Sequence, residues 1–92
     1  MIYILKFSKP LGNAQHTAQY YLGYCDDGRL DSRLSEHRRG LGAAITREAV
    51  ARGYTLDLVL TLPGDRNTEK RLKRRKNHRL IIERAQRGTL QL

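Results

Sequence analysis

Residues 2–7 read IYILKF, and this stretch decides the fold because it is apolar on both faces of an extended chain. A strand of that kind is covered on both sides, so we expect it in the centre of its sheet. Residues 19–25 (QYYLGYC) form a second, tyrosine-rich strand, most simply its antiparallel partner. Residues 8–17 contain proline, glycine and asparagine, which predicts a loop between the two strands.

Two helices are expected after the second strand. Asp26 or Asp27 can cap the first helix, and Gly40 suits a left-handed turn that ends it. A second helix is predicted at residues 44–52, with Thr46 near its N-terminus. The apolar stripe that we expect the first helix to bury consists of Leu30, Leu34 and Leu41.

The last third of the chain supplies one more strand and two more helices. Residues 54–62 alternate between large apolar side chains and mostly polar ones, which is typical of a half-buried strand. Asp65 or Asn67 can cap a third helix, and a fourth is expected at residues 78–87. The order β-β-α-α-β-α-α predicts an α+β fold with a three-stranded antiparallel sheet flanked by helices, in one domain of residues 1–92.

Positive charge is concentrated near the C-terminus. The chain has a formal net charge of +9, and residues 63–92 hold ten Lys or Arg against three Asp or Glu, compared with eight against six in residues 1–62. Such a basic third favours a nucleic-acid partner. An anionic membrane surface is the weaker alternative because the basic segment lacks a large apolar face, and charge that serves only solubility is the third.

Five side chains spread along the chain could together serve phosphodiester cleavage. Arg33 and His37 are four residues apart and point from one face of the first helix. A guanidinium can bind two phosphate oxygens, and an imidazole titrates near neutral pH. Tyr3 and Tyr21 supply phenols that could position or deprotonate water, and Glu69 supplies a carboxylate for one Mg²⁺ or Mn²⁺ ion.

Each of these side chains also has a purely structural interpretation. Arg33 could pair with Glu36 or Asp31, and Glu69 with Lys73 one helical turn away. The helix histidine could be a capping or surface residue. The tyrosines could be core aromatics, although a buried hydroxyl needs a hydrogen-bond partner, which favours a role for a phenol over a plain ring.

Residues 70–79 (KRLKRRKNHR) could follow a phosphate backbone or could be a solvated helix face. No aromatic residue interleaves with the basic ones, so base stacking is not expected and sequence readout should be poor. The residues expected to contact nucleic acid are Lys70, Lys73, Arg74, Arg75, Lys76, Asn77 and Arg79.

Several of these residues belong to one ordered pattern. It consists of Tyr3, Tyr21-Leu22-Gly23, Leu30, Arg33-Leu34, His37, Gly40, Gly42-Ala43, Thr46 and Glu69. This pattern resembles the GIY-YIG endonuclease superfamily, and most closely its small stand-alone bacterial and phage members. The resemblance implies that Tyr21 acts as the base or its relay and that Tyr3 orients the attacking water. It further implies that His37 helps Tyr21 to activate the water, that Arg33 stabilises the phosphate charge and that Glu69 holds the single metal ion.

We therefore expect a metal-dependent endonuclease of low sequence specificity, possessing at most a preference for substrate shape, with DNA favoured over RNA. The substrate could be branched or damaged DNA, and a second copy or a partner protein could supply specificity. The alternatives are a non-catalytic nucleic-acid-binding module on the same fold, and an RNA nuclease or toxin. Cys25 is the single cysteine, and no apolar run approaches the ~20 residues of a membrane span, so a cytoplasmic protein without membrane contact is expected.

Overall fold

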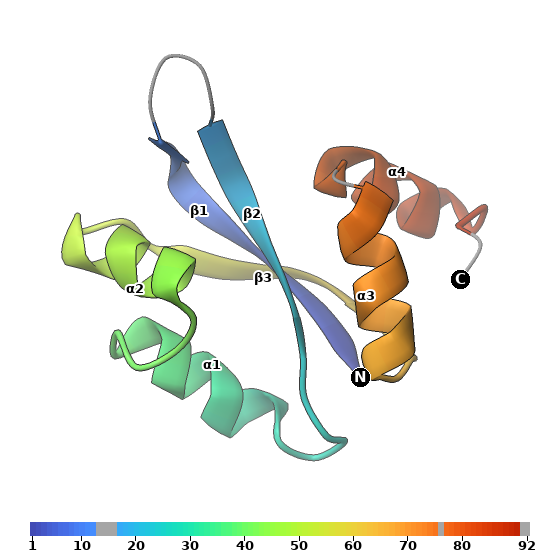
Figure 1. Ribbon diagram of the computed structural model, residues 1–92, viewed down its shortest axis with the longest axis horizontal. Coiled ribbons are helices and arrows are strands. Elements are labelled where there is room, and N and C mark those ends of the chain that lie inside the picture. Colours follow the sequence, from blue (N-terminus) through green and yellow to red (C-terminus); the bar gives the residue numbers. More distant parts are fainter. Residues whose placement is uncertain (13–16, 76, 91–92) are drawn as a thin grey trace.

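The computed structural model describes residues 1–12, 17–75 and 77–90. Within them, β1 (Ile2–Gly12), β2 (Thr17–Tyr24) and β3 (Leu56–Leu62) form an antiparallel sheet in the order β2-β1-β3. The elements follow the order β-β-α-α-β-α-α, so the α+β fold and the central position of the first strand are confirmed (Figure 1).

Two helices cover each face of the sheet. The helices α1 (Leu30–Arg38) and α2 (Ala44–Ala51) lie on one side, and α3 (Arg66–Arg75) and α4 (His78–Arg87) lie on the other (Figure 1). The central strand contributes to both cores, which explains its continuous apolar sequence. The core under α1 and α2 contains Tyr3, Leu5, Phe7, Leu11, Cys25, Leu34, Ala49 and Leu56. The core under α3 and α4 contains Ile2, Ile4, Leu22, Leu72 and Ile81.

The strands differ from the prediction at their ends. β1 continues to Gly12 and β2 begins at Thr17, so the loop predicted for residues 8–17 is wrong for most of that stretch, and residues 13–16 lie outside the described part. The register between β1 and β2 shifts between Lys6 and Leu11. Such an irregularity lets a strand include Pro10, which has no N–H for the ladder.

The third strand begins two residues later than its alternating pattern suggests. The Tyr54 amide donates to the Ala49 carbonyl at 3.0 Å and so closes the end of α2. That hydrogen bond commits residue 54 to the helix terminus, and β3 starts at Leu56. The alternation of apolar and polar side chains extends back to residue 54, but the backbone N–H of that residue is used by the end of α2.

Two predictions for the first helix are also wrong: the aspartate cap at its start and the burial of Leu41. Arg29 is the N-cap residue and no side chain caps α1, while Asp26 instead accepts from the Tyr24 hydroxyl at 3.1 Å. Leu41 is 65% exposed because α1 ends at Arg38 and the chain has already turned away at Gly40, with φ +75°. Gly40 therefore ends the helical segment as predicted, and Leu41 lies beyond the helix and outside its buried stripe.

The start of α3 is built as expected. Asp65 Oδ1 accepts from the Thr68 amide at 2.9 Å and from the Thr68 hydroxyl at 3.1 Å. These hydrogen bonds lower the pKa of the Asp65 carboxyl, the backbone one most strongly. This cap fixes where α3 begins, and therefore which of its residues face the edge of the sheet.

Candidate active site

Three of the five predicted side chains meet at one cavity of about 330 Å³. Tyr21 comes from β2, Arg33 from α1 and Glu69 from α3. The two helices lie on opposite faces of the sheet, but β2 is an edge strand, so side chains from both faces can reach around it. The other lining residues are Tyr24, Cys25, Asp26, Arg29, Glu36 and Arg66.

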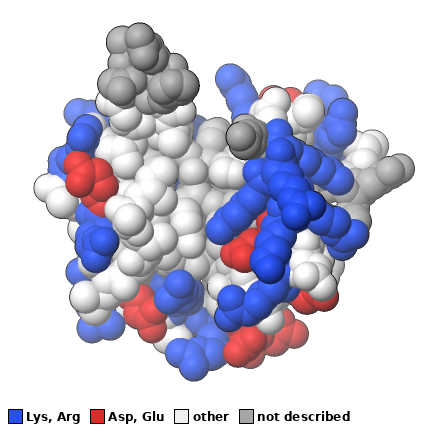
Figure 2. All heavy atoms as spheres, viewed as in Figure 1, with Lys and Arg blue, Asp and Glu red and all other residues white. Residues whose placement is uncertain are grey.

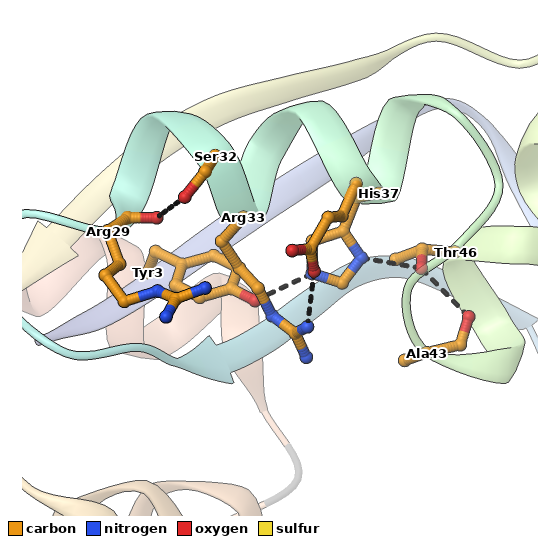
Figure 3. A network of polar contacts seen from close by, with 8 residues as sticks. Tyr3, Arg29, Ser32, Arg33, His37, Ala43 and Thr46 are labelled. Atoms are coloured by element: carbon orange, nitrogen blue, oxygen red, sulfur yellow. Dashed lines mark hydrogen bonds and ion pairs between the residues drawn. The ribbon is translucent and has the colours of Figure 1, made fainter.

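The other two predicted residues lie directly behind this cavity without lining it. Tyr3 and His37 are both fully buried, and the Tyr3 hydroxyl oxygen is 2.7 Å from His37 Nε2. The imidazole's other nitrogen, Nδ1, is 2.8 Å from the hydroxyl oxygen of Thr46, which is also buried. The Thr46 hydroxyl donates to the Ala43 carbonyl at 2.9 Å (Figure 3).

The direction of each hydrogen bond in this chain follows from its last member. The Ala43 carbonyl can only accept, so the Thr46 hydroxyl hydrogen points to it and its oxygen accepts from His37 Nδ1–H. His37 Nε2 then carries no hydrogen and accepts from the Tyr3 hydroxyl. The network holds a neutral imidazole and fixes its tautomer.

The pKa shifts agree with that assignment. Burial, followed by the nearby Arg33 charge, lowers the pKa of His37, which favours the neutral ring. Burial raises the pKa of Tyr3 to about 12, although a hydrogen bond from Arg33 opposes the shift. Tyr3 is therefore a protonated donor at neutral pH.

Two glycines make room for this buried network. A Cβ on Gly23 would lie 2.5 Å from Tyr3 Cζ and 2.8 Å from Tyr21 Cε2. A Cβ on Gly42 would overlap the His37 ring, with 2.6 Å to its Cε1. These contacts give two of the three glycines of the sequence pattern a steric reason: Gly23 and Gly42 each let a catalytic candidate lie against bare backbone.

Arg33 forms the ion pair of its structural interpretation and also lines the cavity. Its Nη1 is 2.9 Å from Glu36 Oε2, so the proposed ion pair exists. The same guanidinium hydrogen-bonds the Tyr3 hydroxyl, which is the main reason why the pKa of Arg33 is raised. Its side chain remains 38% exposed and lines the cavity, so it is still accessible to an anion.

Tyr21 connects the buried network to the cavity. Its ring centroid is 6.2 Å from that of Tyr3 and 5.1 Å from that of His37. Burial raises the pKa of Tyr21, the Arg33 charge lowers it and the Glu69 charge raises it. Tyr21 therefore lies beside the Tyr3–His37 pair, in which the one hydroxyl hydrogen of Tyr3 is donated to His37 Nε2. The other two tyrosines of β2, Tyr20 and Tyr24, pack against the core under α3 and α4.

Glu69 offers a cation one carboxylate. Its side chain is only 16% exposed, and one oxygen, Oε2, is 3.6 Å from Lys73 Nζ. No group of three or more His, Cys, Asp or Glu side chains suited to a metal occurs in the described ranges. One carboxylate in a polar cavity suits Mg²⁺ or Mn²⁺, which takes hard oxygen ligands and keeps several waters.

The predicted basic residues are spread over the surface of α3 and the start of α4. Figure 2 shows Lys and Arg gathered over α3, beside an uncharged strip that runs over β2. Asn77 accepts from the Leu80 amide at 3.1 Å and caps α4, so its carbonyl oxygen has a structural role, and Arg79 lies 3.9 Å from Glu83. Lys76 lies outside the described residues. Lys70, Lys73, Arg74 and Arg75 belong to α3.

Sequence reasoning missed two cations of the cavity. Arg29 and Arg66 line it, and the guanidinium carbon of Arg66 is 5.0 Å from the Tyr24 ring centroid. Both directly precede or begin a helix, but their charge alone did not set them apart from 16 other basic residues. Only the tertiary arrangement places them beside Glu69.

Comparisons with protein-family models, with curated proteins and with solved structures find no match for this chain. Its interpretation therefore depends on the cavity and on its neighbours. None of the helices in the part of the chain described here is long and apolar enough to cross a membrane.

Proposed function

We propose that this protein is a metal-dependent endonuclease of the GIY-YIG type, which hydrolyses phosphodiester bonds in nucleic acid, DNA in preference to RNA. The observation that carries the proposal is the meeting of Tyr21, Arg33 and Glu69 at one cavity, from three separate elements. Core packing alone would not require a phenol, a guanidinium and a carboxylate to share a solvent-reachable space.

Arg33 is the group that binds the phosphate. A guanidinium presents two parallel donors to phosphate oxygens and opposes the negative charge that grows during in-line attack. Its ion pair with Glu36 holds the guanidinium at the cavity wall, and its hydrogen bond to Tyr3 connects the guanidinium to the buried network. Arg29 and Arg66 add positive charge around the same space.

Tyr21 accepts the proton of the attacking water, and its neighbours relay a proton onward from it. As Tyr21 accepts a proton, its own can pass to Tyr3, and the Tyr3 proton can pass to His37 Nε2. The product of this relay is an imidazolium that keeps its bond to Thr46. The pKa of His37 is lowered, so the imidazolium gives up its proton readily. Because His37 is fully buried, that proton passes back through Tyr3 and Tyr21 to reach the leaving oxygen or solvent.

Glu69 is the residue that would hold the cation. When bound, a divalent cation would supply Lewis-acid stabilisation of charge on the phosphate and on the leaving oxygen. Glu69 is only 16% exposed and lines the same cavity as Tyr21, so a cation that it holds would lie beside the phenol.

A second candidate is a nucleic-acid-binding module without catalytic turnover. Its support is that the two key charges are already paired within the chain: Arg33 with Glu36 at 2.9 Å, and Glu69 with Lys73 at 3.6 Å. Both candidates predict binding to polyanions, and only the first predicts cleavage.

A cleavage assay separates them. Purified protein is incubated with supercoiled plasmid, branched DNA and RNA, each with Mg²⁺ or Mn²⁺. Glu69→Ala and Arg33→Ala should each lower the cleavage rate at least about 100-fold, because each removes charge stabilisation from the transition state. The exposed pair Glu48 and Arg52 on α2 provides matched controls, and Glu48→Ala and Arg52→Ala should cleave like the wild type.

Cleavage that all four variants retain would identify a contaminant and refute the proposal. Binding by the wild type without cleavage of any substrate would favour the second candidate. Preferential cleavage of RNA would revise the substrate class and leave the site assignment in place.

A further inference from the structure

A second and larger cavity adjoins the candidate active site. It measures about 520 Å³ and extends along β2, between the start of α2 and the junction of α3 with α4. Tyr21 lines both cavities, so they meet at that side chain. The lining residues that matter here are Gln19, Tyr20, Tyr21, Lys73, His78 and Arg79.

The chemistry of this cavity suits a phosphate backbone. Lys73 and Arg79 supply positive charge, and no Asp or Glu is among the described residues that line this cavity, although Glu83 lies 3.9 Å from Arg79 outside it. The His78 ring is committed to the Tyr20 backbone, which anchors α4 against the edge of β2. The edge strand is thus covered near Tyr20, while the side chains of Lys73 and Arg79 remain 46% and 81% exposed.

Lys73 connects the two cavities. It lines the second cavity, yet its ammonium lies 3.6 Å from Glu69 Oε2 and 5.7 Å from the Tyr21 ring centroid. The side chain is 46% exposed and has four rotatable bonds, so it can change partner. An ion pair this long, four residues apart on a helix and partly exposed, is weak, so Lys73 can exchange it for another partner.

We propose that the second cavity is a phosphate subsite for the nucleic acid beside the scissile bond, and that Lys73 couples this subsite to Glu69. Lys73 holds the Glu69 carboxylate when no cation is bound, and moves to a phosphate in the second cavity when Glu69 binds a divalent cation. The inference rests on the proposed function, because it assumes that Glu69 is the cation ligand.

The consequence is reciprocal coupling between the two ligands. Lys73 competes with the cation for Glu69, so it weakens cation binding by the free protein. A phosphate that engages Lys73 removes this competition, so nucleic acid strengthens cation binding and the cation strengthens nucleic-acid binding by the same factor.

Two binding measurements test the coupling without any need for cleavage. The first is the affinity of the free protein for Mn²⁺, read from the electron paramagnetic resonance signal of unbound Mn²⁺. Lys73→Met should raise that affinity about two- to fivefold. Lys9→Met removes the same charge from a lysine that lines neither cavity, and should leave it unchanged.

The second measurement is the affinity for a short labelled duplex, by fluorescence anisotropy at matched ionic strength, before cleavage proceeds. Mn²⁺ should tighten binding by the wild type and by Lys9→Met about two- to fivefold. Lys73→Met should bind more weakly and should show no Mn²⁺-dependent gain. A wild-type Mn²⁺ affinity in Lys73→Met, or a full Mn²⁺-dependent gain, would overturn the coupling.

Glu69→Gln separates this inference from the proposed function. If the wild type and Glu69→Gln bind Mn²⁺ equally, Glu69 is not the ligand, and the metal assignment fails together with the coupling. If Glu69→Gln abolishes Mn²⁺ binding while Lys73→Met leaves it unaltered, only the coupling fails.

Discussion

At the scale of single residues, the site depends on how closely side chains approach backbone. The Tyr3 ring lies on Gly23 and the His37 ring lies on Gly42, and neither position has space for a methyl group. Both rings are fully buried, so neither can move aside into solvent. The glycines are therefore as necessary to the network as the groups that form its hydrogen bonds.

Gly23→Ala is predicted to displace Tyr3 and to break its bond with His37. The overlap with Tyr3 and Tyr21 should lower the free energy of unfolding by about 1–3 kcal/mol, as overpacking of a core does. Urea denaturation measures the loss, and near-ultraviolet circular dichroism reports the tyrosines. Gly28→Ala, which meets open space at φ +85°, should leave the tyrosine signal unaltered.

Thr46→Val is predicted to release the tautomer of His37. Without the hydroxyl, His37 Nδ1–H loses its acceptor in a buried site, which should cost about 1–3 kcal/mol of stability. The ¹⁵N chemical shifts of His37 should show hydrogen on Nδ1 in the wild type and in Thr46→Ser, but not as the single form in Thr46→Val. Hydrogen on Nε2 in the wild type would contradict the assigned direction of the network.

At the scale of elements, α3 carries both Glu69 and Lys73, so the start of this helix determines how the two cavities are lined. Asp65→Ala should lower stability and helix content, because the Thr68 amide loses its acceptor. Asp65→Asn should retain most of both, since asparagine also caps helices. Circular dichroism and thermal unfolding measure the difference, and equal behaviour of the two variants would contradict the role of this cap.

The elements also show how far the sequence could be interpreted. The apolar run of β1 predicted its central position, and Asp65 and Gly40 marked helix ends correctly because their hydrogen bonds or backbone angles are local. The start of β3 and the cap of α1 were wrong because neighbouring groups compete for the same residues: the Tyr54 amide donates to Ala49, and Asp26 accepts from the Tyr24 hydroxyl. The end of β1 was wrong because its extension depends on pairing with β2.

The candidate site divides in the same way. The pattern of residue types predicted that Tyr21, Arg33 and Glu69 would meet, and they do. It did not predict that Tyr3 and His37 would be sealed behind the cavity, because burial depends on how α1 and α2 pack on the sheet. The roles of Arg29 and Arg66 also required the tertiary arrangement.

At the scale of the whole molecule, a buried neutral histidine makes stability depend on pH. The pKa of His37 is lowered in the folded protein from its ordinary 6.5, so the unfolded chain binds more protons below that value. The free energy of unfolding should therefore be fully retained above about pH 6.5 and should fall as the pH decreases below it.

Urea denaturation between pH 7.5 and pH 5 measures this dependence. His37→Gln should flatten part of the slope and leave the rest, because burial also lowers the pKa of His78. A wild type whose stability does not change over this range, or a slope that His37→Gln leaves intact, would contradict the buried neutral imidazole.

The central claim is that Tyr21, Arg33 and Glu69 surround one scissile phosphate. A crystal structure of the protein with Mn²⁺ and a short duplex tests it most directly. The account predicts an anomalous Mn²⁺ peak about 2.0–2.2 Å from a Glu69 carboxylate oxygen, with a backbone phosphate between this ion and the Arg33 guanidinium. A duplex bound on another face, or Mn²⁺ bound away from Glu69 while the cavity beside Tyr21 stays free of phosphate, would contradict it.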